Sequence, residues 1–99
     1  MPAYIISDVT VKDREAYEAY RTRAAPSITQ YGGRYLARGT AIESLEGNWT
    51  PRIIVLVEFP DLESARSWYR SPEYTATLAF REAGLSRKLI LVDGVPQPL

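Results

Sequence analysis

Strand-like and helix-like patterns of apolar residues alternate along the chain, beginning with a strand and a helix. Residues 4–11 are rich in β-branched and aromatic side chains, which is typical of a strand. From Asp13, a candidate N-cap, apolar residues recur at helical spacing as far as Tyr31, and Gly32-Gly33 then predicts the end of the helix. Pro26 lies inside this pattern and predicts a kink or the start of a second short helix, because proline has no N–H to donate.

The rest of the chain adds three strands and a second helical region. We expect a strand over residues 34–45 with a bulge at Gly39, a turn over 46–51, a strand over 52–59, a helix from Asp61 that restarts at Ser71-Pro72 and ends at Gly84, and a strand over 89–93. This β-α-β-β-α-β order predicts a ferredoxin-like α+β fold with a four-stranded sheet, antiparallel or mixed. Right-handed crossovers lead us to expect the first and third strands to be parallel in its centre, with the second and fourth at the edges. A single domain then spans residues 1–95, and residues 96–99 form an irregular tail.

Both faces of the predicted sheet are apolar, although both helical regions pack on one of them. Alternation assigns to the helix side Ile5, Val9, Val11, Ile53, Val55, Val57 and Phe59, and to the other side Tyr4, Ile6, Asp8, Leu36, Ile54, Leu56 and Glu58. A second face that met water would alternate to polar residues. We therefore predict a homodimer in which two sheets face each other, because burying this face favours association. The alternative is that the edge hairpin or the C-terminal tail folds over it.

Charge and composition narrow the classes of function. Twelve basic and twelve acidic residues give a formal net charge of zero, which argues against binding nucleic acid or an anionic membrane through bulk charge. The chain has neither cysteine nor histidine, so thiolate nucleophiles, cysteine-bound metals and the commonest general base are excluded. We expect no cofactor and no metal. The N-terminus shows no signal peptide and no apolar run is long enough to span a membrane, so we expect a cytoplasmic protein.

Several longer motifs resemble one known family, the domain of unknown function family 1330. The matching segments are residues 13–20, 31–39, 45–49, 58–60, 68–74 and 89–94, with Asp93 where the family pattern leads us to expect Glu. The resemblance implies a dimeric α+β barrel, the architecture shared with small antibiotic-biosynthesis-type monooxygenases. It implies no particular activity, and the histidine that binds haem in the haem-degrading relatives is absent here.

Asp8, Glu58, Arg38 and Arg34 are the candidate site residues among the charged ones. If the first and third strands are parallel, Asp8 and Glu58 lie toward the same end of the sheet face away from the helices. Arg38 then falls opposite Glu58, unless a bulge at Gly39 brings Arg34 there instead. In a water-poor cavity, carboxylates beside an arginine can move a proton or hold a polar ligand. Asp8 and Glu58 are therefore the candidate catalytic residues; the alternative is a structural Arg38–Glu58 ion pair that fixes the dimer.

Tyr4 and Tyr31 are the aromatic residues predicted to line a pocket, together with Arg34 and Arg38 as ligand-binding residues. Most other aromatic residues stand at helical spacing and predict core packing, and the helix arginines, Arg21 among them, are interpreted as solvated. Trp49 in the hairpin loop is expected to contact the dimer partner.

Two functions remain open from the sequence. One is a small-molecule pocket between sheet and helices, with cofactor-independent oxygenation or isomerisation as candidate chemistry. The other is a non-catalytic ligand-binding or structural dimer. An RNA-binding domain of the same topology does not fit, because the central strands lack the aromatic residues on which bases would stack.

Overall fold

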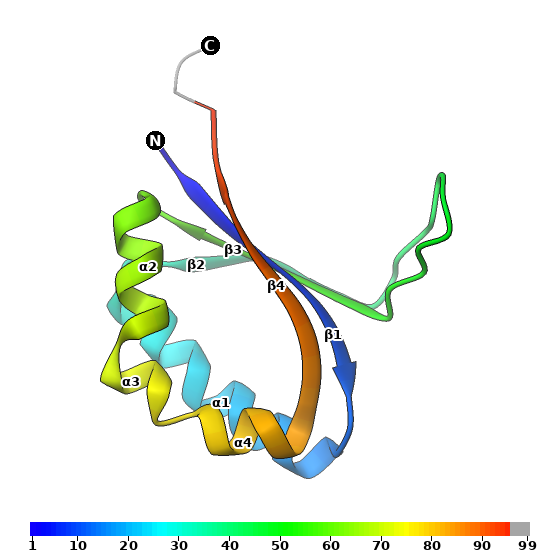
Figure 1. Cartoon of the computed structure of the whole chain (residues 1–99), viewed down its shortest axis with the longest axis horizontal. Coiled ribbons are helices and arrows are strands. Elements are labelled where there is room, and N and C mark those ends of the chain that lie inside the picture. Colours follow the sequence, from blue (N-terminus) through cyan, green and yellow to red (C-terminus); the bar gives the residue numbers. More distant parts are fainter. Residues whose placement is uncertain (96–99) are drawn as a thin grey trace.

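A computed structural model describes residues 1–95, and the predicted tail over residues 96–99 lies outside the described part. The elements are β1 (Ala3–Val11), α1 (Arg14–Gln30), β2 (Arg34–Gly39), β3 (Ile53–Phe59), α2 (Leu62–Arg70), α3 (Pro72–Thr75), α4 (Leu78–Gly84) and β4 (Leu85–Asp93). They form one sheet in the strand order β2-β3-β1-β4, with all the helices on one of its faces (Figure 1). The predicted ferredoxin-like α+β fold is confirmed.

The prediction that the first and third strands are parallel is wrong. β1 runs antiparallel to both of its neighbours, β3 and β4, and β2 runs antiparallel to β3. The crossover through α1 connects β1 to β2, which share a direction, and β3 lies between them. The expectation that a strand–helix–strand crossover joins two parallel strands therefore holds for β1 and β2, which are not adjacent in the sheet.

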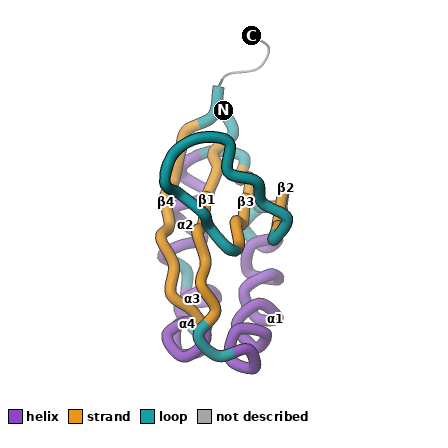
Figure 2. Tube along the Cα trace, turned by 90° about the vertical axis from the view of Figure 1, so that its right-hand side faces the viewer, coloured by secondary structure: helices purple, strands orange, loops and turns teal. Residues whose placement is uncertain are grey.

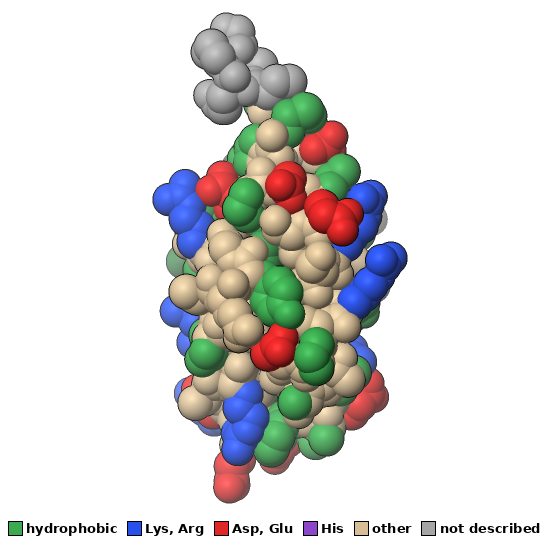
Figure 3. All heavy atoms as spheres, turned by 90° about the vertical axis from the view of Figure 1, so that its left-hand side faces the viewer, with side chains coloured by type: hydrophobic (Ala, Val, Ile, Leu, Met, Phe, Trp, Pro, Cys, Tyr) green, Lys and Arg blue, Asp and Glu red, His purple; other side chains and the backbone are tan. Residues whose placement is uncertain are grey.

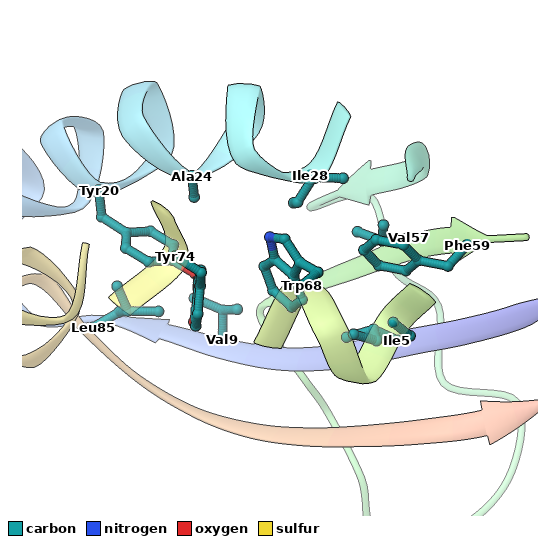
Figure 4. Packing of buried hydrophobic residues seen from close by; sticks show 11 residues of the cluster. Ile5, Val9, Tyr20, Ala24, Ile28, Val57, Phe59, Trp68, Tyr74 and Leu85 are labelled. Atoms are coloured by element: carbon teal, nitrogen blue, oxygen red, sulfur yellow. Dashed lines mark hydrogen bonds between the residues drawn. The ribbon is translucent and has the colours of Figure 1, made fainter. Parts of the chain in front are cut away.

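The helix side of the sheet carries the core, and the predicted alternation holds there. Ile5, Val9, Val57 and Phe59 are buried under the helices. In Figure 4, Trp68 of α2 projects into the space between α1 and the sheet. Its ring lies against Phe59, with centroids 5.6 Å apart. Its indole Nε1 donates to Ser27 Oγ of α1 at 3.0 Å, so the one polar atom of this large side chain is satisfied inside the core.

Three element boundaries differ from those expected. α1 continues through Pro26, which is exposed, so the predicted start of a second short helix is not found there. β2 ends at Gly39, and residues 40–52 form a long exposed loop, here called the arm. β4 begins at Leu85 and pairs from there with Val11 of β1.

The other face of the sheet has no helix over it and is called the open face. Its central part consists of Tyr4, Ile6, Asp8, Ile54, Leu56, Glu58, Ile90 and Val92, which lie side by side in the strand register. Viewed from that side, the arm passes in front of the strands (Figure 2). Ile90 is nevertheless 56% exposed and Leu36 45%, so the arm does not cover the face as a lid.

Candidate functional site

A cavity of about 50 Å³ lies between α1 and the helix side of the sheet. Its apolar wall is formed by Ile5, Val9, Ile28, Val55, Val57, Trp68, Leu85 and Leu89, and its polar lining by Ser7, Tyr17, Tyr20, Arg21, Tyr35, Arg38 and Arg87. The cavity therefore has room for a few water molecules or a short apolar group, at roughly 10–15 Å³ for each water. The cavity is smaller than the roughly 300–1,000 Å³ of most small-molecule sites, but an apolar wall with a few convergent polar groups is the lining that such sites have.

Two phenols and a guanidinium lie together at one side of the cavity. The Tyr20 and Tyr74 hydroxyl oxygens are 3.1 Å apart, and Figure 4 shows the two rings approaching each other from α1 and α3. Arg87 of β4 donates to Tyr20 through Nη1 at 2.8 Å and to Tyr74 through Nη2. Burial raises the pKa of Tyr20 well above its ordinary value of 10.0, against the opposing charge of Arg87. Tyr20 is therefore a neutral phenol at physiological pH.

In the cluster of Tyr20, Tyr74 and Arg87, one of the two hydroxyl protons is not used in a hydrogen bond within the cluster. Two phenols carry two protons, and only one is used in the Tyr20–Tyr74 hydrogen bond, because Arg87 is a donor to both oxygens. When Tyr74 donates to Tyr20, the proton of Tyr20 is free, and Tyr20 lines the cavity. In that arrangement the neutral phenol of Tyr20 can donate a hydrogen bond to a bound molecule.

Arg21 and Arg38 mark the mouth of the cavity. Both also line a surface hollow of about 360 Å³ outside it, together with Arg14, Tyr17 and Glu18. The guanidinium of Arg38 lies over the Tyr35 ring at 4.3 Å, and that of Arg21 over the Tyr17 ring at 5.5 Å. Stacking on rings that are themselves part of the wall holds these flexible side chains beside the opening.

Arg38 reaches this mouth because of a bulge that differs from the predicted one. Tyr35 pairs with Val57 and Ala37 with Leu56, so Leu36 is the extra residue and the register shifts before Gly39. Arg38 therefore lies opposite Val55 on the helix side, and its expected position opposite Glu58 is wrong. A bulge that inserts one residue exchanges the two faces for every position after it.

Asp8 and Glu58 lie on the open face, away from the cavity and from each other. Because β1 and β3 are antiparallel, Glu58 is opposite Tyr4 and Asp8 is opposite Ile54, at opposite ends of the sheet. The expectation that the two carboxylates lie toward one end is wrong. Glu58 accepts a hydrogen bond from Arg34 Nε at 2.8 Å, the alternative pairing that a bulge was predicted to allow. The catalytic role predicted for Asp8 and Glu58 stays a prediction.

Tyr4, Tyr31 and Trp49 do not line the cavity. Tyr4 is on the open face, and Tyr31 donates to Glu73 Oε1 at 2.6 Å, a bond that raises the pKa of Tyr31. The Trp49 indole donates to Asp8 Oδ2 at 3.0 Å, so the arm is tied to β1 of its own chain while the side chain stays 58% exposed. Its expected contact with a partner stays a prediction.

Sequence reasoning missed Arg21, Tyr20 and Arg87 as site residues. Arg21 stands four residues after Tyr17, in the stripe that also holds Ala24 and Ile28, so its position on the sheet side was visible in the helical spacing. Arg87 is the middle member of the alternating inward set Leu85, Arg87 and Leu89. Polar residues stand between the members of this set, so the sequence pattern did not indicate that β4 begins at Leu85.

Within residues 1–95, no group of three or more acidic residues is placed to hold a metal ion. None of the helices described is both long and apolar enough to cross a lipid bilayer. The helix-covered side shows basic and acidic side chains interspersed (Figure 3).

The fold and the open face define a class, the ferredoxin-like α+β domains that carry their helices on one side of a single sheet. Within it, the chain belongs to the family described as Domain of unknown function (DUF1330), which matches residues 2–95. The resemblance seen in the sequence motifs is confirmed. No curated protein matches the chain.

Solved structures with this fold include proteins of unknown function and one oxygenase. A protein of unknown function from Rhodopseudomonas palustris has a TM-score of 0.79 at 21% identity, covering 96% of this chain and 83% of that one. SnoaB, a cofactor-independent oxygenase from Streptomyces nogalater, has a TM-score of 0.70 at 12% identity, covering 98% and 96%. A dimeric ferredoxin-like protein of unknown function from Thermobifida fusca has a TM-score of 0.64 at 19% identity, covering 94% and 91%. At these identities the likeness extends to the fold alone.

Proposed function

We propose that this protein is a homodimer in which each subunit binds a small organic molecule in the cavity between α1 and the sheet. The observation that carries the proposal is the cavity itself, an apolar space with phenol and guanidinium groups on its lining and an opening at Arg21 and Arg38. Most of a protein interior is filled by side chains and voids larger than a water molecule are few, so a lined and open space of this kind is a candidate binding site.

The open face supports the homodimer. Ile6 lies between Leu56 and Ile90 in the strand register, so an apolar strip crosses three strands of this face. Removing such a strip from water favours association. The solved structure from Thermobifida fusca is itself a dimer of the same fold.

The two tryptophans provide a direct test by NMR spectroscopy. Trp68 lines the cavity, whereas Trp49 is on the arm. Titration with butyramide and butyrate, whose short chains suit a cavity of this size, should shift the indole N–H signal of Trp68 and leave that of Trp49 in place. If neither probe moves the Trp68 signal, or if both indoles move together, the cavity is not the binding site.

A variant that fills the cavity completes this test. Ser7 is buried on its lining, so Ser7→Leu should remove the response of Trp68 to the probes. Thr10→Leu makes the same kind of change at an exposed position of the same strand and should leave the response intact. Binding that survives Ser7→Leu in a folded variant would contradict the proposal.

A second candidate is that the same cavity is catalytic without a cofactor. The unused phenolic proton of the Tyr20–Tyr74–Arg87 cluster favours it, and SnoaB, with the same fold, is a cofactor-independent oxygenase. A bicyclic substrate such as 1,4-dihydroxynaphthalene would extend from the cavity into the outer hollow of about 360 Å³. Oxygen uptake with this substrate should then exceed the uncatalysed rate and fall to that rate in Tyr20→Phe. Equal uptake with and without the protein would leave binding as the function and dismiss this candidate.

A further inference from the structure

We propose that the ligand is an organic monoanion, a small carboxylate with a short apolar body, whose carboxylate is bound between Arg21 and Arg38. This inference rests on the proposed function and adds the chemical class of the molecule.

The cavity has an unbalanced set of charges in a chain whose charges balance overall. Arg21, Arg38 and Arg87 all line it, and no aspartate or glutamate of the described residues does. Three guanidinium groups beside an apolar space repel one another and disfavour a cationic ligand. An anion in or at this space removes that repulsion.

The three arginines are not equally available to such an anion. Arg87 already donates to the hydroxyls of Tyr20 and Tyr74. Arg21 has one ion pair, with Glu18 at 3.0 Å, through a single Nη1 atom. Arg38 stacks on the Tyr35 ring, and within residues 1–95 no carboxylate lies within ion-pair distance of it. The free donors therefore belong to Arg38 and to the remaining nitrogens of Arg21.

The geometry of the mouth suits a carboxylate. Each guanidinium presents a planar fork of N–H groups, which matches the two oxygens of a carboxylate better than a single point charge does. Tyr35, on which Arg38 stacks, brings no opposing charge, because burial raises its pKa and keeps the phenol neutral. Among the described residues, Glu18 is the one acidic residue on the outer hollow, and it forms an ion pair with Arg21.

The cavity beyond the mouth selects the body of the ligand. Its wall is largely aliphatic, with Val9, Val55 and Leu89 among its members, so a hydrocarbon chain gains by leaving water there. A volume of about 50 Å³ admits a short chain, and a larger body would extend into the outer hollow of about 360 Å³. The carboxylate thus lies where the two spaces meet, at the residues they share.

Matched probes test the charge directly. Butyrate and butyramide have nearly the same shape and differ in charge, and butylamine supplies the opposite charge. In the NMR titration of Trp68, butyrate should bind about tenfold more tightly than butyramide, as a charge-assisted hydrogen bond requires, and butylamine should not bind. Raising the salt concentration should weaken butyrate and leave butyramide unchanged.

Substitution on a single strand supplies the control. Arg38→Gln should lower butyrate affinity about tenfold to the level of butyramide, and Arg21→Gln should act in the same direction. Arg34→Gln removes the same charge from the same strand at a position that pairs with Glu58 on the open face, and it should leave butyrate affinity unchanged.

The outcomes separate this inference from the proposed function. If butyrate and butyramide bind equally well to the wild type and to Arg38→Gln, the cavity binds molecules and the anionic class is wrong. If Arg34→Gln weakens butyrate as much as Arg38→Gln does, the effect is one of overall charge and the site between Arg21 and Arg38 is refuted. If neither probe moves the Trp68 signal, the proposed function fails first.

Discussion

Arginine side chains on and beside the sheet differ in what they can do because each is held by a different partner. Arg34 pairs with Glu58 on the open face, where its side chain is 71% exposed. Arg87 donates to two phenols inside the fold. Arg38 stacks on an aromatic ring with its N–H groups still available. The three side chains are of one type, so it is the difference in their interaction partners that leaves Arg38 able to bind a ligand.

Glu58→Gln tests whether a residue of the open face contributes to binding in the cavity on the helix side of the sheet. The pair that it breaks joins an Arg34 side chain that is 71% exposed to a Glu58 side chain that is 23% exposed, and it contributes about 1 kcal/mol to the free energy of unfolding because solvent screens the charge of Arg34. Because Glu58 lies across the sheet from the cavity, binding of butyrate to the variant should match the wild type. Chemical denaturation and the NMR titration check both points. Loss of butyrate binding in a fully folded variant would instead place Glu58 in the site.

Asp61, the N-cap of α2, makes a contribution to protein stability that depends on pH. Its Oδ1 accepts from the backbone N–H of Ser64 at 2.7 Å, and this bond lowers the pKa of Asp61 below its ordinary 3.8. A folded pKa below the unfolded one means that the stabilisation is complete above the unfolded pKa and is lost as the pH falls through the folded pKa. The difference in melting temperature between wild type and Asp61→Ala should therefore be largest near neutral pH and shrink below pH 4. A difference that stays constant down to pH 2 would contradict this origin.

At the scale of elements, the sequence predicts the regular parts of this fold and misplaces its irregular ones. Alternation in residues 53–59 assigned each side chain to its face correctly, because a strand without a bulge turns successive side chains to opposite faces. The position of a bulge, in contrast, is not indicated by any pattern of apolar and polar residues. Nothing in the run of residues 34–39 distinguishes an extra residue at Leu36 from one at Gly39, yet that choice decides the face on which Arg38 lies.

The end of α4 is fixed by a close approach that glycine alone permits. A Cβ on Gly84 would lie 2.6 Å from the Tyr17 backbone nitrogen and 2.8 Å from the Ala16 carbonyl carbon. The Gly84 carbonyl also accepts from the N–H groups of Lys12 and Asp13, so it holds the start of α1 in place. Gly84→Ala should therefore destabilise the protein by about 1–3 kcal/mol, as forced overpacking does.

Gly39→Ala is the matched control for that substitution, because a Cβ there meets no atom within 4 Å. Urea denaturation should show a clear loss of stability for Gly84→Ala and little change for Gly39→Ala. Equal effects of the two substitutions would mean that helix and strand propensity, and not the approach of α1, explains the loss.

At the scale of the whole molecule, the two faces of the one sheet have different roles. The helix side encloses the cavity, and the open face provides the apolar strip for a second subunit. The alternation in the strands already predicted this division. The cavity was harder to locate from the sequence, because it depends on Arg21, Arg38 and Arg87 meeting from three separate elements.

Ile6→Asp tests the dimer at its centre. Ile6 lies between Leu56 and Ile90 on the open face, and a carboxylate there would have to be buried without a partner. Light scattering should give twice the mass of one chain for the wild type and the mass of one chain for the variant. Thr75→Asp, on the exposed part of α3, should remain a dimer. A wild-type monomer, or a dimer that tolerates Ile6→Asp, would contradict an interface on this face.

A crystal structure of the protein grown with saturating butyrate tests the proposed carboxylate site most directly. We predict electron density for one butyrate in each subunit, with its carboxylate between the guanidinium groups of Arg21 and Arg38 and its chain directed toward Val55 and Leu89. Density for butyrate elsewhere, with the space between these two arginines holding none, would contradict the account.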